Sequence, residues 1–316
     1  MKYWWVNHKK TSKHEIAGGF LWSPMRNQNG ARNQFYDNMR NASPGDALIS
    51  YSHAEIRFYG LITDFAIPSP KPPSFGTTGD NWDKKNGWLL PVKWKAMAAP
   101  MRPKDRIHEF SGFLPEKYSP IHPLTGNGGQ NAYLAEINKR IFDLLVGEVD
   151  FDDEHFSFPQ GSMLSVMNEI DSSIEDLIFK DGAVDSTTKE MLVAARVGQG
   201  VFKKRISEFE RSCRLTRLET SSLLIASHIK PWRLCDTASE RLDGANGLLL
   251  APHVDLLFDR GLISFTDEGD VLVSSRLRLV DLDALGLKDA CGVRGKAFQR
   301  RQAVYLRFHR DNIFLV

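Results

Sequence analysis

Short apolar runs separated by turn residues dominate the first half of the chain. Four runs rich in β-branched and aromatic residues lie between clusters of Gly, Pro and Asn: Tyr3 to Val6, Ala47 to Tyr51, Phe58 to Thr63 and Leu89 to Trp94. Runs of this length and composition are typical of β-strands. The pattern predicts a compact, mostly β domain with a few helices.

Beyond residue 160 the apolar pattern changes to helical spacing. Apolar residues recur every three or four positions, which predicts one amphipathic helix. Its stripe could pack on the chain's own domains or join two copies into a homodimer. Two further helices are predicted at Thr187 to Val197 and Gly200 to Arg211. The stripe consists of Met163, Val166, Met167, Ile170, Ile174, Leu177 and Ile178.

Charge divides the chain into three parts that the net value of +2 conceals. Residues 1–147 hold 19 basic and 12 acidic side chains, residues 148–190 hold 2 and 12, and residues 191–316 hold 20 and 15. Because polyanions bind to locally clustered cations, this segregation fits two nucleic-acid-facing domains and an acidic connector. An ordinary solvated linker would show the same acidic run. With 316 residues and 42% hydrophobic residues, two cores are expected.

Cysteine usage and hydropathy exclude several classes of protein. Cys213, Cys235 and Cys291 form no Cys-x-x-Cys pair, which argues against a disulfide framework and a cysteine-rich zinc site. The start of the chain lacks a secretory signal pattern, and no run of about 18 apolar residues occurs. We therefore expect a soluble, cytoplasmic protein without a membrane partner.

Three motifs in the last third of the chain predict a strand, a loop, a second strand and a helix. They are Ala226 to Trp232 (ASHIKPW), Asn246 to Leu250 (NGLLL) and His253 to Gly261 (HVDLLFDRG). The first strand is expected to end at His228 and the helix to begin near Pro252. In this order the motifs resemble the HNH, or ββα-metal, nucleases over about Arg196 to Ser275. The resemblance implies hydrolysis of phosphodiesters with a divalent metal.

Each of the polar residues in these motifs has a chemical role to match. His228 is the expected general base, because an imidazole with a pKa of about 6.5 can accept a proton from water near neutral pH. A lone buried histidine, by contrast, is usually a hydrogen-bonded core residue. The resemblance implies that Asn246 holds the loop that carries this histidine. One departure stands out, since many HNH enzymes have a metal ligand where this chain has Ser227.

Carboxylates in the third motif are the expected metal ligands. Asp255 and Asp259 lie four residues apart and thus on one helix face, and the family places a ligand at the position of Asp255. Asp259 could instead pair with Arg260 or charge the helix end. Oxygen ligands favour Mg²⁺ or Mn²⁺, whereas His253 would also permit Ni²⁺, Co²⁺ or Zn²⁺. Candidate phosphate contacts nearby are Lys230, Arg233, Arg241 and Arg260.

The N-terminal part resembles a second family, the EVE domain, a β-barrel of the PUA superfamily. The likeness rests on Lys2 to Asn7, Gly45 to Tyr51, Tyr59 to Ile62, Leu21 to Arg26 and Gly30 to Tyr36. It implies a pocket that holds a flipped, modified base. The candidate walls of this pocket are Trp22, Tyr36 and Trp82, and core packing is the alternative for each of these aromatic residues. Asp64 is a candidate acceptor for the cytosine amino group. Arg26 and Arg32 are candidate phosphate contacts.

Together the two resemblances indicate an α+β protein of two domains, similar to type IV, modification-dependent EVE-HNH restriction endonucleases. The expected order is a PUA-like EVE barrel at 1–147, a partly helical linker at 148–190 and a ββα-metal nuclease at 191–316. The expected partner is double-stranded DNA carrying 5-methylcytosine or 5-hydroxymethylcytosine. Two alternatives stay open: an inert reader of modified nucleic acid, and a non-selective or RNA-directed nuclease.

Overall fold

The computed structural model describes residues 1–129, 132–149, 151, 163–180, 185–196, 201–292 and 295–316. They form two compact units, Met1–Asp171 and Ser172–Val316. The division falls inside the segment that we expect to be a linker. Each unit mixes helices with strands, so the fold is mixed α/β.

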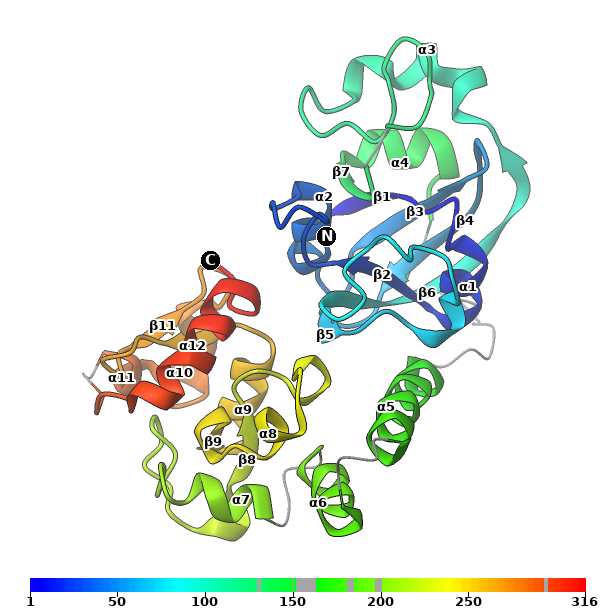
Figure 1. Cartoon of the computed structure of the whole chain (residues 1–316). Helices are drawn as coiled ribbons and strands as arrows, with labels where there is room; N and C mark the ends of the chain where they lie inside the picture. Colours follow the sequence, from blue (N-terminus) through cyan, green and yellow to red (C-terminus); the bar gives the residue numbers. More distant parts are fainter. Residues whose placement is uncertain (130–131, 150, 152–162, 181–184, 197–200, 293–294) are drawn as a thin grey trace. The chain divides into compact units, whose positions relative to one another are not determined.

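An open, curled sheet of seven strands builds the first unit (Figure 1). Its strand order is β2-β6-β4-β3-β1-β7, with β5 added beside β6, so β2 and β7 end the path among the described strands. Only β1 and β3 run parallel. The sheet thus curls without the closure that a complete barrel would need. The strands are β1 (Tyr3–Asn7), β2 (Phe20–Pro24), β3 (Ala47–Ser52), β4 (Glu55–Ile62), β5 (Ile67–Ser69), β6 (Gly87–Met101) and β7 (Leu134–Ile137).

Four short helices accompany the sheet: α1 (Ser12–Gly18), α2 (Gln34–Asn41), α3 (Ile107–Phe110) and α4 (Lys139–Val146). The side chain of Asn138 caps α4 by accepting from the Ile141 N–H at 2.9 Å. Phe142 of α4 and Phe110 of α3 are buried with Trp5 in one core cluster. All four predicted strand runs are strands here, namely parts of β1, β3, β4 and β6.

The predicted amphipathic helix is α5 (Met163–Lys180), which crosses the boundary between the units. Val166 and Ile170 of the first unit are buried, as are Ile174 and Ile178 of the second, whereas Leu177 is 70% exposed. The chain itself therefore covers most of the stripe, as in the alternative of packing on its own domains. Among the described residues no helix has the length and apolarity needed to cross a membrane.

The next two helices are α6 (Ser186–Arg196) and α7 (Val201–Ile206). Val197 and Gly200, at the ends of the predicted helices, lie outside the described residues. The prediction that the second helix reaches Arg211 is wrong. The chain turns after Ile206, and the buried Glu210 instead accepts hydrogen bonds from Arg214 and Gln302.

A two-stranded hairpin followed by a helix forms the centre of the second unit. It consists of β8 (Ile225–His228), β9 (Gly247–Leu250) and α9 (Pro252–Asp259), with α8 (Ala238–Leu242) in the loop between the strands. The first strand ends at His228 and the helix begins at Pro252, as predicted. The remaining elements are β10 (Ile263–Phe265), β11 (Val271–Val273), α10 (Leu279–Ala284), α11 (Lys288–Cys291) and α12 (Arg300–Asn312).

Candidate active site

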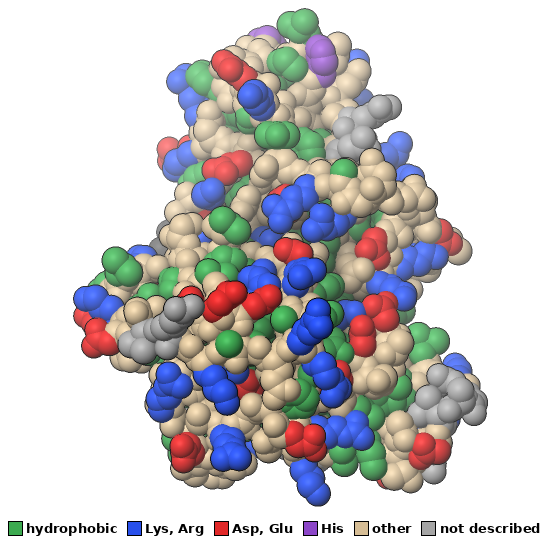
Figure 2. Space-filling model, turned by 60° about the vertical axis from the view of Figure 1, so that its left-hand side comes forward, with side chains coloured by type: hydrophobic (Ala, Val, Ile, Leu, Met, Phe, Trp, Pro, Cys, Tyr) green, Lys and Arg blue, Asp and Glu red, His purple; other side chains and the backbone are tan. Residues whose placement is uncertain are grey.

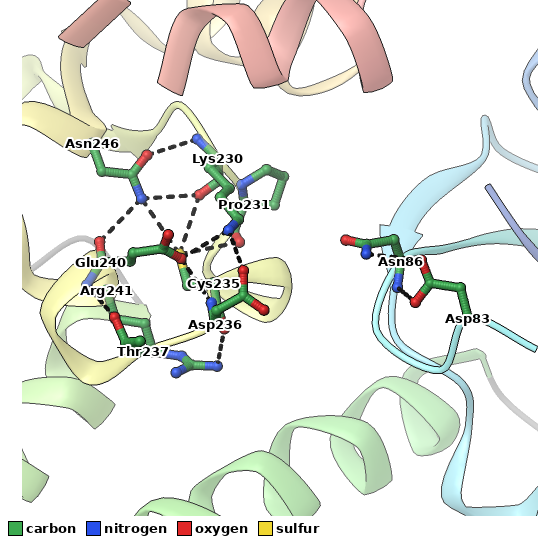
Figure 3. Close-up of polar contacts among 10 residues, drawn as sticks. All are labelled: Asp83, Asn86, Lys230, Pro231, Cys235, Asp236, Thr237, Glu240, Arg241 and Asn246. Atoms are coloured by element: carbon green, nitrogen blue, oxygen red, sulfur yellow. Dashed lines mark hydrogen bonds and ion pairs between the residues drawn. The ribbon is translucent and has the colours of Figure 1, made fainter. Parts of the chain in front are cut away.

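Asn246 is the anchor of the loop between β8 and β9. Its side chain is fully buried. Its Oδ1 accepts from the Lys230 N–H at 2.7 Å, and its Nδ2 donates to the carbonyls of Lys230 and Glu240 at 3.2 and 3.1 Å (Figure 3). Because one amide holds both ends of the loop, Asn246 fixes the path of the chain just after His228. This is the geometric role that the resemblance implies.

His228 is held by the carbonyl next to the one that Asn246 binds. Its Nε2 lies 3.0 Å from the Arg241 carbonyl oxygen. A carbonyl only accepts, so Nε2 carries the hydrogen and Nδ1 carries the lone pair. Within the part of the chain that the structure describes, Nδ1 has no hydrogen-bond partner. Nδ1 is therefore the ring nitrogen that is able to accept a proton.

The surroundings keep this imidazole neutral. Burial lowers the pKa of His228 to about 4, against the smaller opposing effect of the hydrogen bond to the Arg241 carbonyl. The ring of Phe202 lies flat against it, with centroids 3.8 Å apart and an interplanar angle of 10°. Water is thereby excluded from one face of the ring. At neutral pH the side chain is an uncharged base.

Two carboxylates and one hydroxyl come together where β8 meets α9. Asp255 and Asp259 lie one turn apart on α9, and the buried Ser227 hydroxyl donates to Asp259 Oδ1 at 3.4 Å. Burial raises the pKa of both carboxyl groups, and for Asp259, which keeps some solvent exposure, the charge of Asp255 raises it further. Asp255 Oδ1 is buried without a hydrogen-bond partner. Two carboxyl groups that repel each other when ionised thus lie together, and one of their oxygens has no donor.

This donor set fits a hard divalent cation. An orphaned carboxylate oxygen and a repelling carboxylate beside it are the groups that a cation would satisfy. Mg²⁺ commonly takes only one or two protein carboxylates and completes its shell with water and substrate phosphate. Among the described residues no group of three or more His, Cys, Asp and Glu side chains lies close enough to hold a metal by itself. His253 accordingly does not join the pair; two residues before Asp255, it points to another side of α9.

Lys230 and Arg241, two of the predicted phosphate contacts, are engaged by the loop itself. The Lys230 ammonium is 2.8 Å from both Asp236 and Glu240 (Figure 3). The guanidinium of Arg241 donates to the Cys235 carbonyl at 2.6 Å. A phosphate would have to displace a carboxylate to reach Lys230, so the structure favours a scaffolding role for it.

Arg233 lies near enough to Asp259 for its positive charge to oppose the rise in the pKa of that carboxyl. It is therefore the predicted phosphate contact that the structure brings to the carboxylate pair. More widely, Figure 2 shows Lys and Arg side chains interspersed with Asp and Glu on the face that it draws. The face drawn there is therefore not a surface of one sign.

Trp22 and Trp82 of the first unit lie together. Their ring centroids are 6.1 Å apart with an interplanar angle of 28°. Trp22 is buried on β2, with Nε1 donating to the Ser69 carbonyl at 3.2 Å and its backbone N–H donating to the buried Glu15 at 2.9 Å. Trp82 is half-buried in the loop before β6. One fixed and one more exposed aromatic face each other.

The other candidate pocket residues are not brought into ring contact with this pair. Tyr36 of α2 packs edge-on against Tyr133, with centroids 6.4 Å apart. Asp64 Oδ1 accepts from the Phe65 N–H at 2.8 Å in the turn after β4. The roles of Tyr36 and Asp64 in a base pocket stay predictions.

Arg26 and Arg32 lie close to Asp37. Their positive charges, with that of Arg40, oppose the burial that raises the pKa of the Asp37 carboxyl. Asp37 directly follows the Gly30 to Tyr36 motif. The two arginines thus lie near each other, as a phosphate site requires, but the Asp37 carboxylate offsets part of their positive charge.

Other site residues could not be found in the motifs. Phe202 lies 26 positions before His228, and the Arg241 contact uses only a backbone carbonyl. A carbonyl leaves no signature in the residue type. The helical spacing of Phe202 and Ile206 was the only signal, and it indicated an ordinary core face.

Comparison with known proteins agrees with the geometry of the hairpin. Residues 213–266 match the family model described as HNH endonuclease. The second unit therefore contains an HNH nuclease domain. No curated protein matches the chain.

Several solved structures resemble about half of the chain. An NMR structure from Rhodopseudomonas palustris is 14% identical over 49% of this chain and 99% of its own, with a TM-score of 0.28. Crystal structures from Agrobacterium tumefaciens (14% identity, 51% and 96% coverage, TM-score 0.30) and Pseudomonas putida (14%, 46% and 97%, 0.32) are comparable. At these TM-scores they carry no inference about this chain.

Proposed function

We propose that this protein is a divalent-metal-dependent endodeoxyribonuclease that cuts DNA near a modified cytosine. The second unit performs the hydrolysis and the first unit reads the base. The observation that carries the proposal is the His228 imidazole, neutral and with an unpartnered Nδ1 among the described residues. It ends the strand β8, whose preceding residue Ser227 contacts the Asp259 carboxylate of α9. The proposal is supported by the HNH match over residues 213–266.

In this proposal each residue of the hairpin has a separate task. His228 Nδ1 accepts a proton from the attacking water, while the Arg241 carbonyl holds Nε2–H and stabilises the imidazolium that forms. Asn246 holds the neighbouring Glu240 carbonyl and so the backbone that carries the Arg241 carbonyl, and Ser227 orients Asp259. A Mg²⁺ or Mn²⁺ ion held by Asp255 and Asp259 would neutralise charge on the phosphate and the leaving oxygen.

A base with a pKa of about 4 is weak in the free protein. The substrate corrects this, because the negative charge of a phosphodiester beside the ring stabilises the protonated form and raises the pKa of His228. His228 then becomes an effective base near neutral pH only when DNA is bound. The same coupling protects the free enzyme from unproductive protonation.

Trp22 and Trp82 are the proposed clamp for the modified base. A base between two aromatic rings needs their planes about 7 Å apart, twice the roughly 3.5 Å of optimal contact. The ring centroids are 6.1 Å apart and the planes are tilted by 28°, so the two rings must separate and become parallel before a base fits between them. Trp82 is the partner that moves, since Trp22 is buried and hydrogen-bonded on β2.

Selectivity in such a clamp has a limit. One methyl group in an apolar pocket is worth roughly 1–3 kcal/mol, or about 10–200-fold. Spare room that admits the methyl group also admits a hydroxyl, so 5-hydroxymethylcytosine is accepted and a glucosylated base is not.

Arg26 and Arg32 then contact the phosphates beside the flipped nucleotide.

The test uses matched plasmids, one with 5-methylcytosine and one without, incubated with the protein and Mn²⁺. We expect preferential cutting of the methylated plasmid, no cutting by His228→Ala, and cutting without preference by Trp82→Ala. Persistent cutting by His228→Ala removes the catalytic assignment. Equal cutting of both plasmids by the unaltered protein removes the reader assignment, and tight binding without cutting identifies an inert reader.

A further inference from the structure

Phe202 covers one whole face of the His228 imidazole. The two rings are nearly parallel at 10°, with centroids 3.8 Å apart, and Phe202 is fully buried. It belongs to α7 (Val201–Ile206), which lies before the residues 213–266 that match the HNH family. The aromatic face is therefore supplied from outside the matched nuclease segment.

The packing between α7 and β9 explains how Phe202 reaches the histidine. Phe202 and Ile206 lie one turn apart on α7, and both are fully buried. They pack against Gly247, which is paired with His228 across the hairpin. A Cβ at position 247 would lie 2.4 Å from Ile206 Cδ1 and 3.0 Å from Phe202 Cζ. Only glycine leaves this space open.

A single hydrogen bond does not fix the plane of an imidazole. The ring can still rock about the line from Nε2 to the Arg241 oxygen, and its χ2 torsion has broad, roughly two-fold preferences. A ring lying flat at 3.8 Å blocks that rotation, because the edge of a turned imidazole would collide with Phe202. With Nε2–H bonded to the carbonyl, the polar ring atom left open is Nδ1.

We propose that Phe202 is a positioning residue for His228, and that Gly247 provides the room it needs. This inference rests on the proposed function, since it concerns how the general base is held. Phe202 touches neither DNA nor metal; it keeps Nδ1 directed at the reacting phosphate. Misplacement of a catalytic group by about 1 Å costs on the order of 100-fold in rate.

The experiment compares Phe202→Leu with Phe265→Leu, a substitution at an equally buried phenylalanine of β10 that makes no ring contact with His228. We expect Phe202→Leu to lower kcat about 10- to 100-fold with KM and DNA affinity unchanged. Phe265→Leu lowers thermal stability and leaves kcat of the folded protein near wild type. Gly247→Ala, which pushes Phe202 and Ile206 away, reproduces the loss of kcat.

A second readout does not depend on cleavage. Nitrogen chemical shifts of the His228 ring report which nitrogen carries the hydrogen; we expect Nε2–H alone in the wild type and a mixture in Phe202→Leu. Equal kcat in the two leucine variants together with an unchanged tautomer overturns the proposal. If Phe202→Leu does not fold, Phe202→Met, of similar volume, replaces it. If the wild type does not cleave DNA, the proposed function fails, and the tautomer still decides the role of Phe202.

Discussion

Two histidines of the second unit have nearly the same surroundings but differ at one ring nitrogen. His228 stacks on Phe202 and donates Nε2–H to the Arg241 carbonyl. His309 of α12 stacks on Phe258, with centroids 3.9 Å apart, and donates Nε2–H to the Phe258 carbonyl at 3.1 Å. Stacking and a fixed tautomer therefore do not by themselves make a catalytic base.

The difference lies at the other ring nitrogen. Nδ1 of His309 accepts from the Ser264 hydroxyl at 2.9 Å, and the residue is 1% exposed. Nδ1 of His228 has no partner among the described residues, and the residue as a whole is partly exposed. In the first unit the buried His8 is satisfied at both nitrogens, by Glu15 and Ser50. Of these three histidines, only His228 has a ring nitrogen without a partner among the described residues, which is what the proposed general base needs.

The strongest test of this comparison replaces each histidine of the pair by alanine. His228→Ala should lower cleavage by about 10²- to 10⁴-fold, the usual contribution of a general base, and it should cost less stability than His309→Ala because only one ring nitrogen loses a partner. His309→Ala should cost about 2–3 kcal/mol of stability, because it leaves Ser264 and the Phe258 carbonyl unsatisfied. Cleavage rates per folded molecule and thermal melts decide. A stable, inactive His309→Ala would break the distinction.

The next test concerns Asn246, which anchors the loop after His228 and has no counterpart beside His309 among the described residues. Asn246→Ala should lose about 2–4 kcal/mol and most activity, since the Lys230 N–H and the carbonyls of Lys230 and Glu240 lose their partner. Asn246→Asp keeps the acceptor for Lys230 but cannot donate to Glu240, so it should be inactive as well. Denaturant unfolding and cleavage measure the two effects. Normal cleavage by Asn246→Asp would show that the hold on the Glu240 carbonyl is dispensable.

The smallest effect on stability is expected at the carboxylates. There the substitution should stabilise the protein, whereas the substitutions above destabilise it. A carboxyl whose folded pKa is raised contributes stability at low pH that is lost as pH rises through the folded pKa. Because Asp259 is an exposed residue, solvent screens much of this penalty. Without metal at pH 8, Asp259→Asn should therefore melt only about 2–4 °C higher than wild type, equivalent to roughly 1 kcal/mol. The gain should shrink as the pH falls and vanish below the ordinary Asp pKa of 3.8, where the carboxyl is protonated in both the folded and the unfolded state.

With metal, we expect the wild type to melt at a higher temperature than Asp259→Asn, the reverse of the order without metal. Mn²⁺ stabilises the wild type by binding the folded state, and Asp259→Asn should gain less from it. The exposed Asp283→Asn serves as the control and should follow the wild type in both conditions. A wild type that melts at the same temperature with Mn²⁺ and with chelator would contradict the assignment of a metal to Asp255 and Asp259.

Prediction from sequence worked where the signal was local. The β8, β9 and α9 elements follow from three short motifs, and the strands of the first unit follow from their apolar runs. The length of α7 was mispredicted, because buried contacts of Glu210 with Arg214 and Gln302 overrode the helical pattern. Likewise, Lys230 reads as a free surface cation in the sequence, yet two carboxylates enclose it.

The sequence alone determined which groups of the second unit could do chemistry: an imidazole, an amide and two carboxylates one helical turn apart. Residue type carries that information, because side-chain chemistry is fixed before folding. Tertiary structure decided how they act. It placed Phe202 on one face of His228, joined Nε2–H to a backbone carbonyl that no motif records, and left Nδ1 open while closing that of His309. Burial and neighbouring atoms set these properties, and both arise only when distant segments pack together.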